Sequence, residues 1–416
     1  MSLRKLALIP LVLFLTASAA AEVAVSATHL KSCRGAIDDF PILILQGSAA
    51  ERGEAHGRLA AREIIDTIDT AASALAERGK SSWDTLLAGA GFFTYSKRFE
   101  SEIAAMLYGI NAALPDANDR VVPSLKRPVS AADIKALHYL ADLRCSQFSA
   151  WGPLTENGQV IIGRNADYAP IMKPSSNCLI AVIPSEPGLC ATLDLLAFGS
   201  IGAGGLALNE HGVYLAPNNG DPKAYTRPGI EPGPMIYRRA LESAGPHSAI
   251  ADVLAVFTSS DCSYSRIFHV AFPLAAGSTD TPAAIQWDCS KQALPIVVRK
   301  PVQDMPHALV ITNHFLPGGK QGDSLNRYNA IDAAIRRHMR GGTKIGSREA
   351  KAILALVDKD TPQSATILSG IVWPAERKIE FAVSPSRGVS ALKGAWRTVE
   401  WNDVFGGNAA VSARPR

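Results

Sequence analysis

The spacing of apolar residues changes abruptly at Cys145, and this change constrains the fold more than any other feature of the 416-residue chain. From about residue 48 to 143, apolar residues recur at steps of three and four, which predicts amphipathic helices. After Cys145, short apolar or alternating runs separated by Gly, Pro and Asn predict many strands, with helices only near 235–257 and 324–357. Helices and strands that occur in separate blocks predict a layered α+β fold rather than alternating βαβ units.

Cys145 itself begins one of the predicted strands. The run that it opens is followed by Asn157-Gly158, a strong signal for a tight hairpin turn, and then by a second run that ends at Tyr168. Arg164 and Asp167 lie near the end of this second run. A thiol, a guanidinium and a carboxylate supply the parts for acyl transfer. The alternatives are a small buried cysteine and a solvated surface ion pair.

The N-terminus has the features of a secretory signal. Arg4 and Lys5 precede an apolar run and then alternating small residues, so we expect residues 1–21 to be a signal peptide. The mature protein is then expected to be secreted or periplasmic, and a retained anchor is the alternative reading. No later apolar run reaches the roughly 20 residues that a membrane span requires. A formal net charge of +4, half of it in this segment, does not indicate a nucleic-acid partner.

The cysteines form no C-x-x-C pair, which argues against zinc or thioredoxin-like sites. Export would permit disulfides. Two pairs flank strand-like runs in the manner of cross-hairpin disulfides, and buried free thiols are the alternative for each pair. The pairs are Cys178 with Cys190 and Cys262 with Cys289. This pairing would leave Cys33 and Cys145 single.

Polar residues also end other predicted strands. Asn218-Asn219 follows a hairpin, Asn313 ends an apolar run, and Arg327 lies at the start of a predicted helix. Asparagine at a strand end is usually a turn former, but side-chain amides can also stabilise an oxyanion. The histidines lack metal-ligand spacing, and the chain has no phosphate loop, no G-x-S-x-G and no H-E-x-x-H motif. We therefore expect no cofactor.

Taken in order, these motifs resemble those of the cysteine N-terminal-nucleophile (Ntn) hydrolases. Within that group the chain looks like the acyl-CoA:6-aminopenicillanate acyltransferase (isopenicillin N acyltransferase) branch, peptidase family C45. Choloylglycine hydrolases and penicillin V acylases are more distant relatives. The motifs that carry the resemblance are Cys145-Ser-Gln-Phe-x-x-Trp151, Gly163-Arg-Asn-x-Asp-Tyr168, Leu208-Asn-Glu-His-Gly-Val213 leading to Asn218-Asn219, Thr312-Asn313, and Ser324-x-x-Arg-Tyr328.

The resemblance implies a four-layer αββα sandwich over residues 145–416, preceded by a mainly helical pro-region over residues 22–144. It also implies a precursor that cleaves itself between Arg144 and Cys145. The cleaved chains would remain associated as a heterodimer that can assemble further.

The resemblance also assigns roles to single residues. Cys145 would be the nucleophile, and its new α-amine, with a reference pKa near 8, can act as general base. Arg164 and Asp167 would flank it. Asn219, preferred over Asn218, and Asn313 would be oxyanion donors, and Arg327 matches the late active-site arginine of the family.

The function expected from these roles is an exported amidohydrolase that removes the acyl group from a small N-acylated molecule. The alternatives are an acyltransferase with an amine acceptor, a non-catalytic periplasmic binding protein of the same fold, and a papain-like protease. The last would need a Cys–His pair, for which no motif is found.

Overall fold

The structure is a computed structural model. It describes residues 31–78, 83–138, 144–168, 174–224, 229–261, 264–275, 280–289, 296–317, 322–361 and 364–406. The predicted signal peptide and Cys262 lie outside these ranges.

The N-terminal region is mainly helical, as the apolar spacing predicts. Its helices are α1 (Ala49–Leu59), α2 (Ala61–Arg78), α3 (Trp83–Ala90), α4 (Lys97–Ala113) and α5 (Ala131–Leu137). Ser130 caps α5 in a capping box with Asp133. Two very short strands, β3 (Val121–Val122) and β4 (Arg127–Pro128), form a separate ladder. The region begins with two strands that the sequence did not predict, β1 (Cys33–Ile37) and β2 (Phe40–Gly47).

Helices α1 and α4 pack with their backbones almost in contact. A Cβ atom on Gly53 would lie 2.1 Å from the carbonyl oxygen of Glu102, and one on Gly57 would lie 2.0 Å from that of Met106. Real side chains do not tolerate such separations, so glycine is required here for close helix approach. This close approach packs α1 directly against α4.

The described residues form two main sheets. The first has the strand order β1-β2-β7-β8-β9-β10-β11-β12-β13. Its remaining strands are β7 (Asn177–Pro184), β8 (Thr192–Ala197), β9 (Ala207–Asn209), β10 (Tyr214–Ala224), β11 (Tyr264–Ala271), β12 (Ala283–Trp287) and β13 (Ile296–Arg299). Strands β2 and β7 are parallel, with Ile42 opposite Leu179. The N-terminal region is therefore part of the sheet as well as a cover for it.

The second sheet has the strand order β14-β5-β6-β16-β17-β18, with β15 paired to β16. Its strands are β5 (Arg144–Ala150), β6 (Ile161–Tyr168), β14 (Ala308–Ile311), β15 (Asp360–Thr361), β16 (Ser364–Trp373), β17 (Lys378–Val383) and β18 (Arg397–Glu400). Strands β5 and β6 form the predicted antiparallel hairpin. Their connection runs from residue 151 to 160 and includes a short 3₁₀ helix, Gly152–Leu154, so it is longer than the tight turn expected at Asn157-Gly158. Gly158 adopts a φ of 74°, a conformation that suits glycine.

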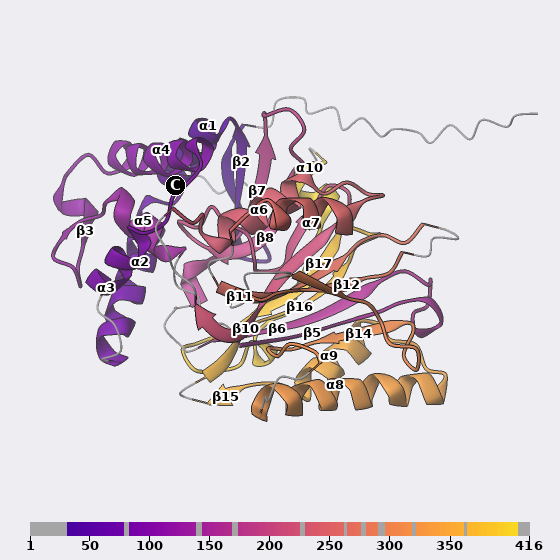
Figure 1. The fold of residues 1–416 in the computed structure, drawn as a ribbon. Helices are drawn as coiled ribbons and strands as arrows, with labels where there is room; N and C mark the ends of the chain where they lie inside the picture. Colours follow the sequence, from indigo (N-terminus) through magenta and orange to yellow (C-terminus); the bar gives the residue numbers. More distant parts are fainter. Residues whose placement is uncertain are drawn as a thin grey trace, which may run out of the picture. The chain divides into compact units, whose positions relative to one another are not determined.

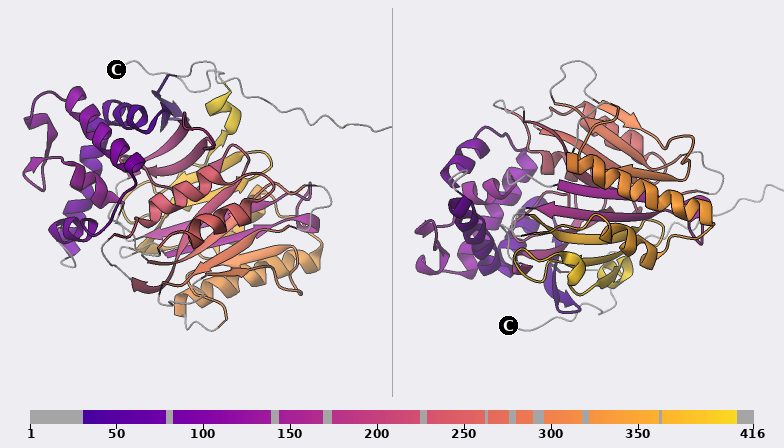
Figure 2. Two further views of the ribbon diagram at one scale, coloured as in Figure 1. Left: turned by 45° about the horizontal axis from the view of Figure 1, so that its top comes forward. Right: turned by 90° about the horizontal axis from the view of Figure 1, so that it is seen from below.

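The two sheets face each other and helices cover both outer faces (Figures 1 and 2). An apolar core that includes Ile44, Leu193, Tyr214 and Phe381 lies between the sheets. Helices α6 (Gly233–Ser243) and α7 (Ala249–Thr258) pack on the first sheet beside α1–α5, and α8 (Gly322–Gly341) and α9 (Ser347–Ala355) pack on the second. A short helix, α10 (Trp401–Phe405), follows β18. The predicted αββα layer order is confirmed.

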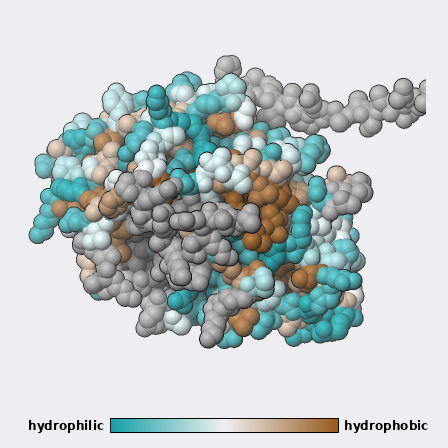
Figure 3. Space-filling view, in the orientation of Figure 1, coloured by the Kyte–Doolittle hydropathy of each residue, from teal (hydrophilic) through white to brown (hydrophobic). Residues whose placement is uncertain are grey.

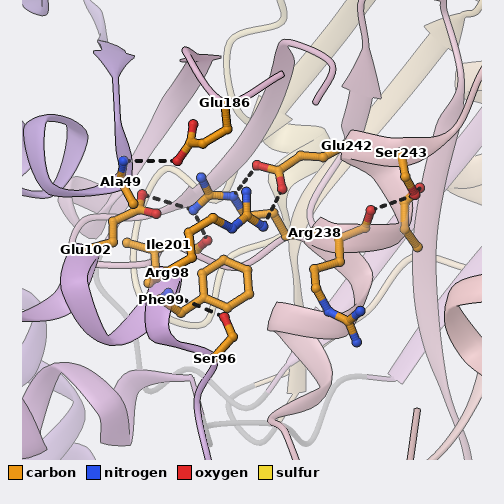
Figure 4. A network of polar contacts seen from close by, with 12 residues as sticks. Ala49, Ser96, Arg98, Phe99, Glu102, Glu186, Ile201, Arg238, Glu242 and Ser243 are labelled. Atoms are coloured by element: carbon orange, nitrogen blue, oxygen red, sulfur yellow. Dashed lines mark hydrogen bonds and ion pairs between the residues drawn. The ribbon is translucent and has the colours of Figure 1, made fainter. Parts of the chain in front are cut away.

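A buried network of charges joins the N-terminal helices to α6 (Figure 4). Glu102 of α4 binds Arg238 of α6 at 3.0 Å, and Arg238 also binds Glu242 at 2.8 Å. Arg98 reaches Glu242 at 2.6 Å, while Arg52 of α1 lies 3.6 Å from Glu102. Buried charges are tolerated when they are paired in this way. The network ties residues on opposite sides of the predicted cleavage point to each other.

One of the two predicted disulfides is wrong. Cys178 and Cys190 are both free thiols. The hairpin register pairs Cys178 with Leu196, so the two cysteines lie at opposite ends of β7 and β8, far beyond the reach of a disulfide. The second pair, Cys262 and Cys289, stays a prediction because Cys262 lies outside the described residues.

The outer surface in Figure 3 is mainly hydrophilic or mixed, with one compact hydrophobic patch right of centre. In the described part of the chain, no helix combines the length and the apolar character needed to cross a membrane.

Candidate functional site

Cys145 lies near the start of β5, a strand that pairs with a neighbour on each side. Side chains alternate along a strand, and Cys145 belongs to the core between the sheets whereas Phe148 faces the outer helices. The Cys145 side chain is fully buried. The thiol is therefore held inside the sandwich, close to the point where the chain enters it.

The backbone of Cys145 is bound by three side chains from distant parts of the chain. Its N–H donates to Oδ1 of Asn313 at 2.9 Å. Its carbonyl oxygen accepts from Nη1 of Arg327 at 2.6 Å and from Nδ2 of Asn218 at 3.4 Å. Arg327 also donates to Oδ1 of Asn313 at 2.8 Å, which links the two ends of the arrangement. Both backbone polar groups of the predicted nucleophile are thus fixed in position.

Arg164 places its guanidinium beside the thiol. Its Nη2 lies 3.7 Å from Sγ of Cys145. The same nitrogen donates to the carbonyl oxygens of Gly204 at 3.2 Å and Pro217 at 3.0 Å, and Nη1 donates to Oδ1 of Asn218 at 3.4 Å. These bonds hold the cation at the sulfur.

Electrostatics keep the thiol neutral in the uncut chain. Burial raises the pKa of the Cys145 thiol, and the positive charges of Arg164, Arg327 and Arg266 oppose that rise without overcoming it. The thiolate is the reactive form of cysteine. An additional base or positive charge would favour the thiolate form of Cys145.

Asp167 lies directly across the hairpin from Arg144, the residue before Cys145. Its Oδ1 accepts from the Thr366 hydroxyl at 2.7 Å, while Oδ2 is buried without a hydrogen-bond partner among the described residues. Burial raises the pKa of this carboxyl to about 6, although the nearby Arg327 acts in the opposite direction. A carboxylate oxygen beside the predicted cleavage point therefore remains open to a donor.

The asparagines Asn218 and Asn219 point in different directions because they are consecutive in β10. Asn218 faces β5, where its Oδ1 accepts from Gln147 Nε2 at 2.5 Å. Asn219 is the cross-strand neighbour of Arg266, and its carbonyl oxygen accepts from Nδ2 of Asn313 at 2.8 Å. The side chain nearer to the Cys145 backbone is thus that of Asn218. The assignment of Asn219 as oxyanion donor stays a prediction.

A cavity of about 210 Å³ opens beside this cluster. Arg164 and Ala166 form part of its wall, and Ala166 is the strand partner of Cys145. Most of the remaining wall is apolar, including Leu195, Pro234 and Leu368, and Asn219 and Arg266 also line it. Apolar walls with a few convergent polar groups are typical of small-molecule sites.

The structure brings together most of the site predicted from the sequence. Cys145, Arg164, Asn313 and Arg327 are connected by direct contacts, Asp167 lies across the hairpin, and Asn219 lines the cavity. Sequence reasoning missed Gln147, Thr366 and Arg266. Arg266 could have been found from the sequence, because a charged residue directly before the apolar run 267–271 is a candidate for a functional site.

Within the described ranges, one group of side chains could offer three metal ligands. The ligand atoms of Cys190, Glu210 and His211 lie within 4.8 Å of one another. Cys190 precedes β8, and the other two residues form the turn between β9 and β10. The group was not predicted because Cys190 lies far from His211 in the sequence.

No protein-family profile and no curated protein matches the chain. Solved structures with a similar fold include two variants of a conjugated bile acid hydrolase from Clostridium perfringens, both with a TM-score of 0.40. They are 10% and 11% identical to this chain, and the matches cover 62% of it and 93% and 97% of the hydrolase chains. A penicillin V acylase from Agrobacterium tumefaciens matches with a TM-score of 0.39 and 13% identity over 62% of this chain and 91% of its own. These similarities are low, so the reaction proposed below rests on the geometry of the site.

Proposed function

We propose that the protein is a cysteine Ntn amidohydrolase of the isopenicillin N acyltransferase-like type, which cleaves the amide bond of a small N-acylated molecule through Cys145. The observation that carries the proposal is the binding of the Cys145 backbone. Its N–H and its carbonyl are held by Asn313 and Arg327, and Arg164 lies at its sulfur. Buried backbone groups need partners in any protein, but here a side-chain amide and a guanidinium supply them at a residue whose sulfur also meets a guanidinium.

Cleavage of the bond between Arg144 and Cys145 would supply the missing base. It would convert the N–H that now donates to Asn313 into an α-amine beside the thiol. An α-amine with a reference pKa near 8 is partly neutral at physiological pH, and this neutral fraction can accept the thiol proton. The open oxygen of Asp167 across the hairpin is available to accept a hydrogen bond from the protonated amine.

The proposed reaction then follows acyl-transfer chemistry. The Cys145 thiolate adds to the amide carbonyl carbon, and side-chain amides of Asn219 and Asn313 stabilise the oxyanion. The protonated α-amine gives its proton to the leaving nitrogen as the carbon–nitrogen bond breaks, leaving a thioester on Cys145. Water hydrolyses the thioester and releases the carboxylic acid, which restores the thiol.

The cleaved chains are proposed to stay together. Strand β2, before the cleavage point, is hydrogen-bonded along its length to β7, after it. The buried ion pairs of Glu102 with Arg238 and of Arg98 with Glu242 join the same two parts (Figure 4). Separation of the chains would expose these charges and the apolar face of β2. We further propose that the protein is exported, on the evidence of the signal-like residues 1–21.

The test is denaturing electrophoresis and N-terminal sequencing of the purified protein, combined with acylase assays on a panel of N-acyl amides. We expect two chains, the second beginning Cys-Ser-Gln-Phe. Cys145→Ala should remain uncut and lose about 10³-fold or more in activity. Cys33→Ala is the matched control, because this half-buried free thiol lies outside the site, and it should behave as wild type.

Full activity of Cys145→Ala would disprove the proposal. A single uncut wild-type chain that binds a ligand without turnover would favour a binding protein instead. Transfer of the acyl group to an added amine, in preference to water, would identify an acyltransferase.

A further inference from the structure

Arg266 of β11 is a buried cation without a carboxylate partner. Its side chain is only 5% exposed. Nε donates to the Tyr237 hydroxyl at 3.2 Å, and the guanidinium lies 4.0 Å from the centre of the Tyr264 ring. Nη1 is buried and has no hydrogen-bond partner among the described residues. A buried charge with an open donor is unfavourable unless something pairs with it.

Other buried arginines of this molecule have partners that account for their charge. Arg238 binds two glutamates, and Arg327 binds Asp323 at 2.9 Å besides the backbone of Cys145. Arg164 has no carboxylate, but three oxygen atoms and the Cys145 sulfur surround its terminal nitrogens. Arg266 has only a tyrosine hydroxyl and a ring. Nε of Arg164 and Nη2 of Arg238 are also buried without a hydrogen-bond partner among the described residues, so the missing carboxylate, rather than the open donor alone, indicates a partner for Arg266 from outside the described chain.

The surroundings of Arg266 show where that partner would lie. Arg266 and Arg164 both line the cavity of about 210 Å³ beside Cys145, and no aspartate or glutamate is among its described lining residues. The cavity is therefore positively charged. Arg266 is also the cross-strand neighbour of Asn219, and such pairs have Cβ atoms about 5 Å apart.

The cavity also connects Arg266 to the reacting group. The positive charge of Arg266 contributes to lowering the pKa of the Cys145 thiol, against the larger effect of burial, so the two groups interact electrostatically across the site. The apolar walls formed by Leu195, Pro234 and Leu368 suit an acyl chain. A molecule in the cavity can thus present an apolar part to the walls and a charged part to Arg266.

We infer that Arg266 binds a carboxylate on the substrate and selects anionic N-acyl molecules over neutral ones. The inference deepens the proposed amidase function and rests on it. A planar guanidinium with open donors matches the geometry of a carboxylate, which it can bind through two parallel hydrogen bonds. The substrate is then an N-acylated molecule with an apolar part and a carboxylate, located on either the amine or the acyl side of the scissile bond.

Binding is measured first, without reliance on turnover. The probes for calorimetry with the purified wild-type protein are N-(octylsulfonyl)glycine and its primary amide, which differ in charge and contain a sulfonamide that a thiol does not cleave. A second pair, 7-(butylsulfamoyl)heptanoate and its primary amide, places the carboxylate on the acyl side of the sulfonamide instead of the amine side. We expect one of the two carboxylates to bind about tenfold or more tightly than its amide.

The variants assign this preference to Arg266. Arg266→Gln should remove it by weakening carboxylate binding while the neutral amide binds as before, and Arg266→Lys should retain part of it. Arg239→Gln is the matched control, since Arg239 lies on α6 and pairs with Glu231 outside the cavity lining. It should keep the full preference. Thermal melting of each variant establishes that it is folded.

Equal binding of carboxylate and amide in both pairs, or a preference that survives Arg266→Gln, would overturn the inference. Turnover is measured separately with N-octanoylglycine, N-octanoylglycinamide and suberic acid mono-butylamide. An Arg266-dependent binding preference without hydrolysis of any substrate would support this inference while the amidase proposal fails. Hydrolysis at equal rates regardless of charge would leave the amidase proposal standing and contradict the role of Arg266.

Discussion

The molecule contains two buried groups of arginines, and they differ in how their charge is balanced. Arg52, Arg98 and Arg238 share Glu102, Glu186 and Glu242, so every cation in this network has a carboxylate partner (Figure 4). Arg164 and Arg266 line the cavity beside Cys145, where the described wall contains no carboxylate. The comparison distinguishes a cluster that stabilises the fold from one that is prepared for an anion.

The pKa values follow the same division. In the paired network, burial would raise the pKa of Glu242, but Arg238 and Arg98 hold it below its usual value. At the site, burial raises the pKa of Asp167 to about 6 because Arg327 compensates only in part. The ion pairs thus favour the ionised form of Glu242, whereas the carboxyl of Asp167 titrates near pH 6. A group that can change its protonation state is useful in catalysis and unfavourable in a structural support.

The largest effect is expected from breaking the balanced network. Glu102→Gln leaves Arg52 and Arg238 without a shared carboxylate in a buried position. We expect the free energy of unfolding to fall by about 3–5 kcal/mol, measured by urea denaturation. Glu54→Gln is the control, because Glu54 forms an exposed pair with Arg58 on the same helical layer and should cause little change. A similar, small effect of both substitutions would contradict the structural role of the network.

Acid should also destabilise the protein, by a smaller amount. Burial lowers the pKa values of His56 and His269 to about 3 and of His138 to about 4. These histidines stay neutral when folded but bind protons when unfolded, so stability is complete above pH 6.5 and is lost as the pH falls. Each histidine should lower the free energy of unfolding by about 2 kcal/mol between pH 7.5 and pH 5.

The buried acids act in the opposite sense. The pKa values of Asp167 and Asp194 are raised to about 6 by burial, so the folded state takes up their protons first as the pH falls. By pH 5, each should raise the free energy of unfolding by about 1.4 kcal/mol. The histidines and the acids together should then lower it by roughly 3 kcal/mol. Urea denaturation at pH 7.5, 6 and 5 measures it. Asp194→Asn should make the acid loss steeper, and a stability that rises on acidification would refute this account.

The smallest effect is expected at the unbalanced cluster. Arg266→Gln removes a buried cation that has no carboxylate partner. The free energy of unfolding of the ligand-free protein should stay the same or rise, by no more than about 1 kcal/mol, because the lost ring contact and hydrogen bond offset the gain. Thermal and urea denaturation measure it beside Glu102→Gln. A fall as large as that of Glu102→Gln would mean that Arg266 is a structural residue.

Part of this picture could be predicted from local sequence. The helical block and the antiparallel pairing of the two strands that flank Asn157-Gly158 depend on residues close together in the chain, and both are as expected. The pairing of Cys178 with Cys190 was wrong because Cys190 precedes β8 at the turn end of the hairpin, whereas Cys178 lies near the far end of β7, opposite Leu196. Strand β2 was missed since its parallel partner lies more than a hundred residues further on.

By itself the sequence determined the layered α+β fold, the position of Cys145 at the head of a strand, and the order of the polar residues that follow it. These features depend on periodicity and on turn residues, which act over a few positions. Only the tertiary structure decided which atoms meet: Asn313 and Arg327 at the Cys145 backbone, Arg164 at its sulfur, and Arg266 in the wall of the cavity. Those contacts join residues between 19 and 182 positions apart. The local sequence does not specify such long-range contacts, because they depend on how the two sheets pack face to face.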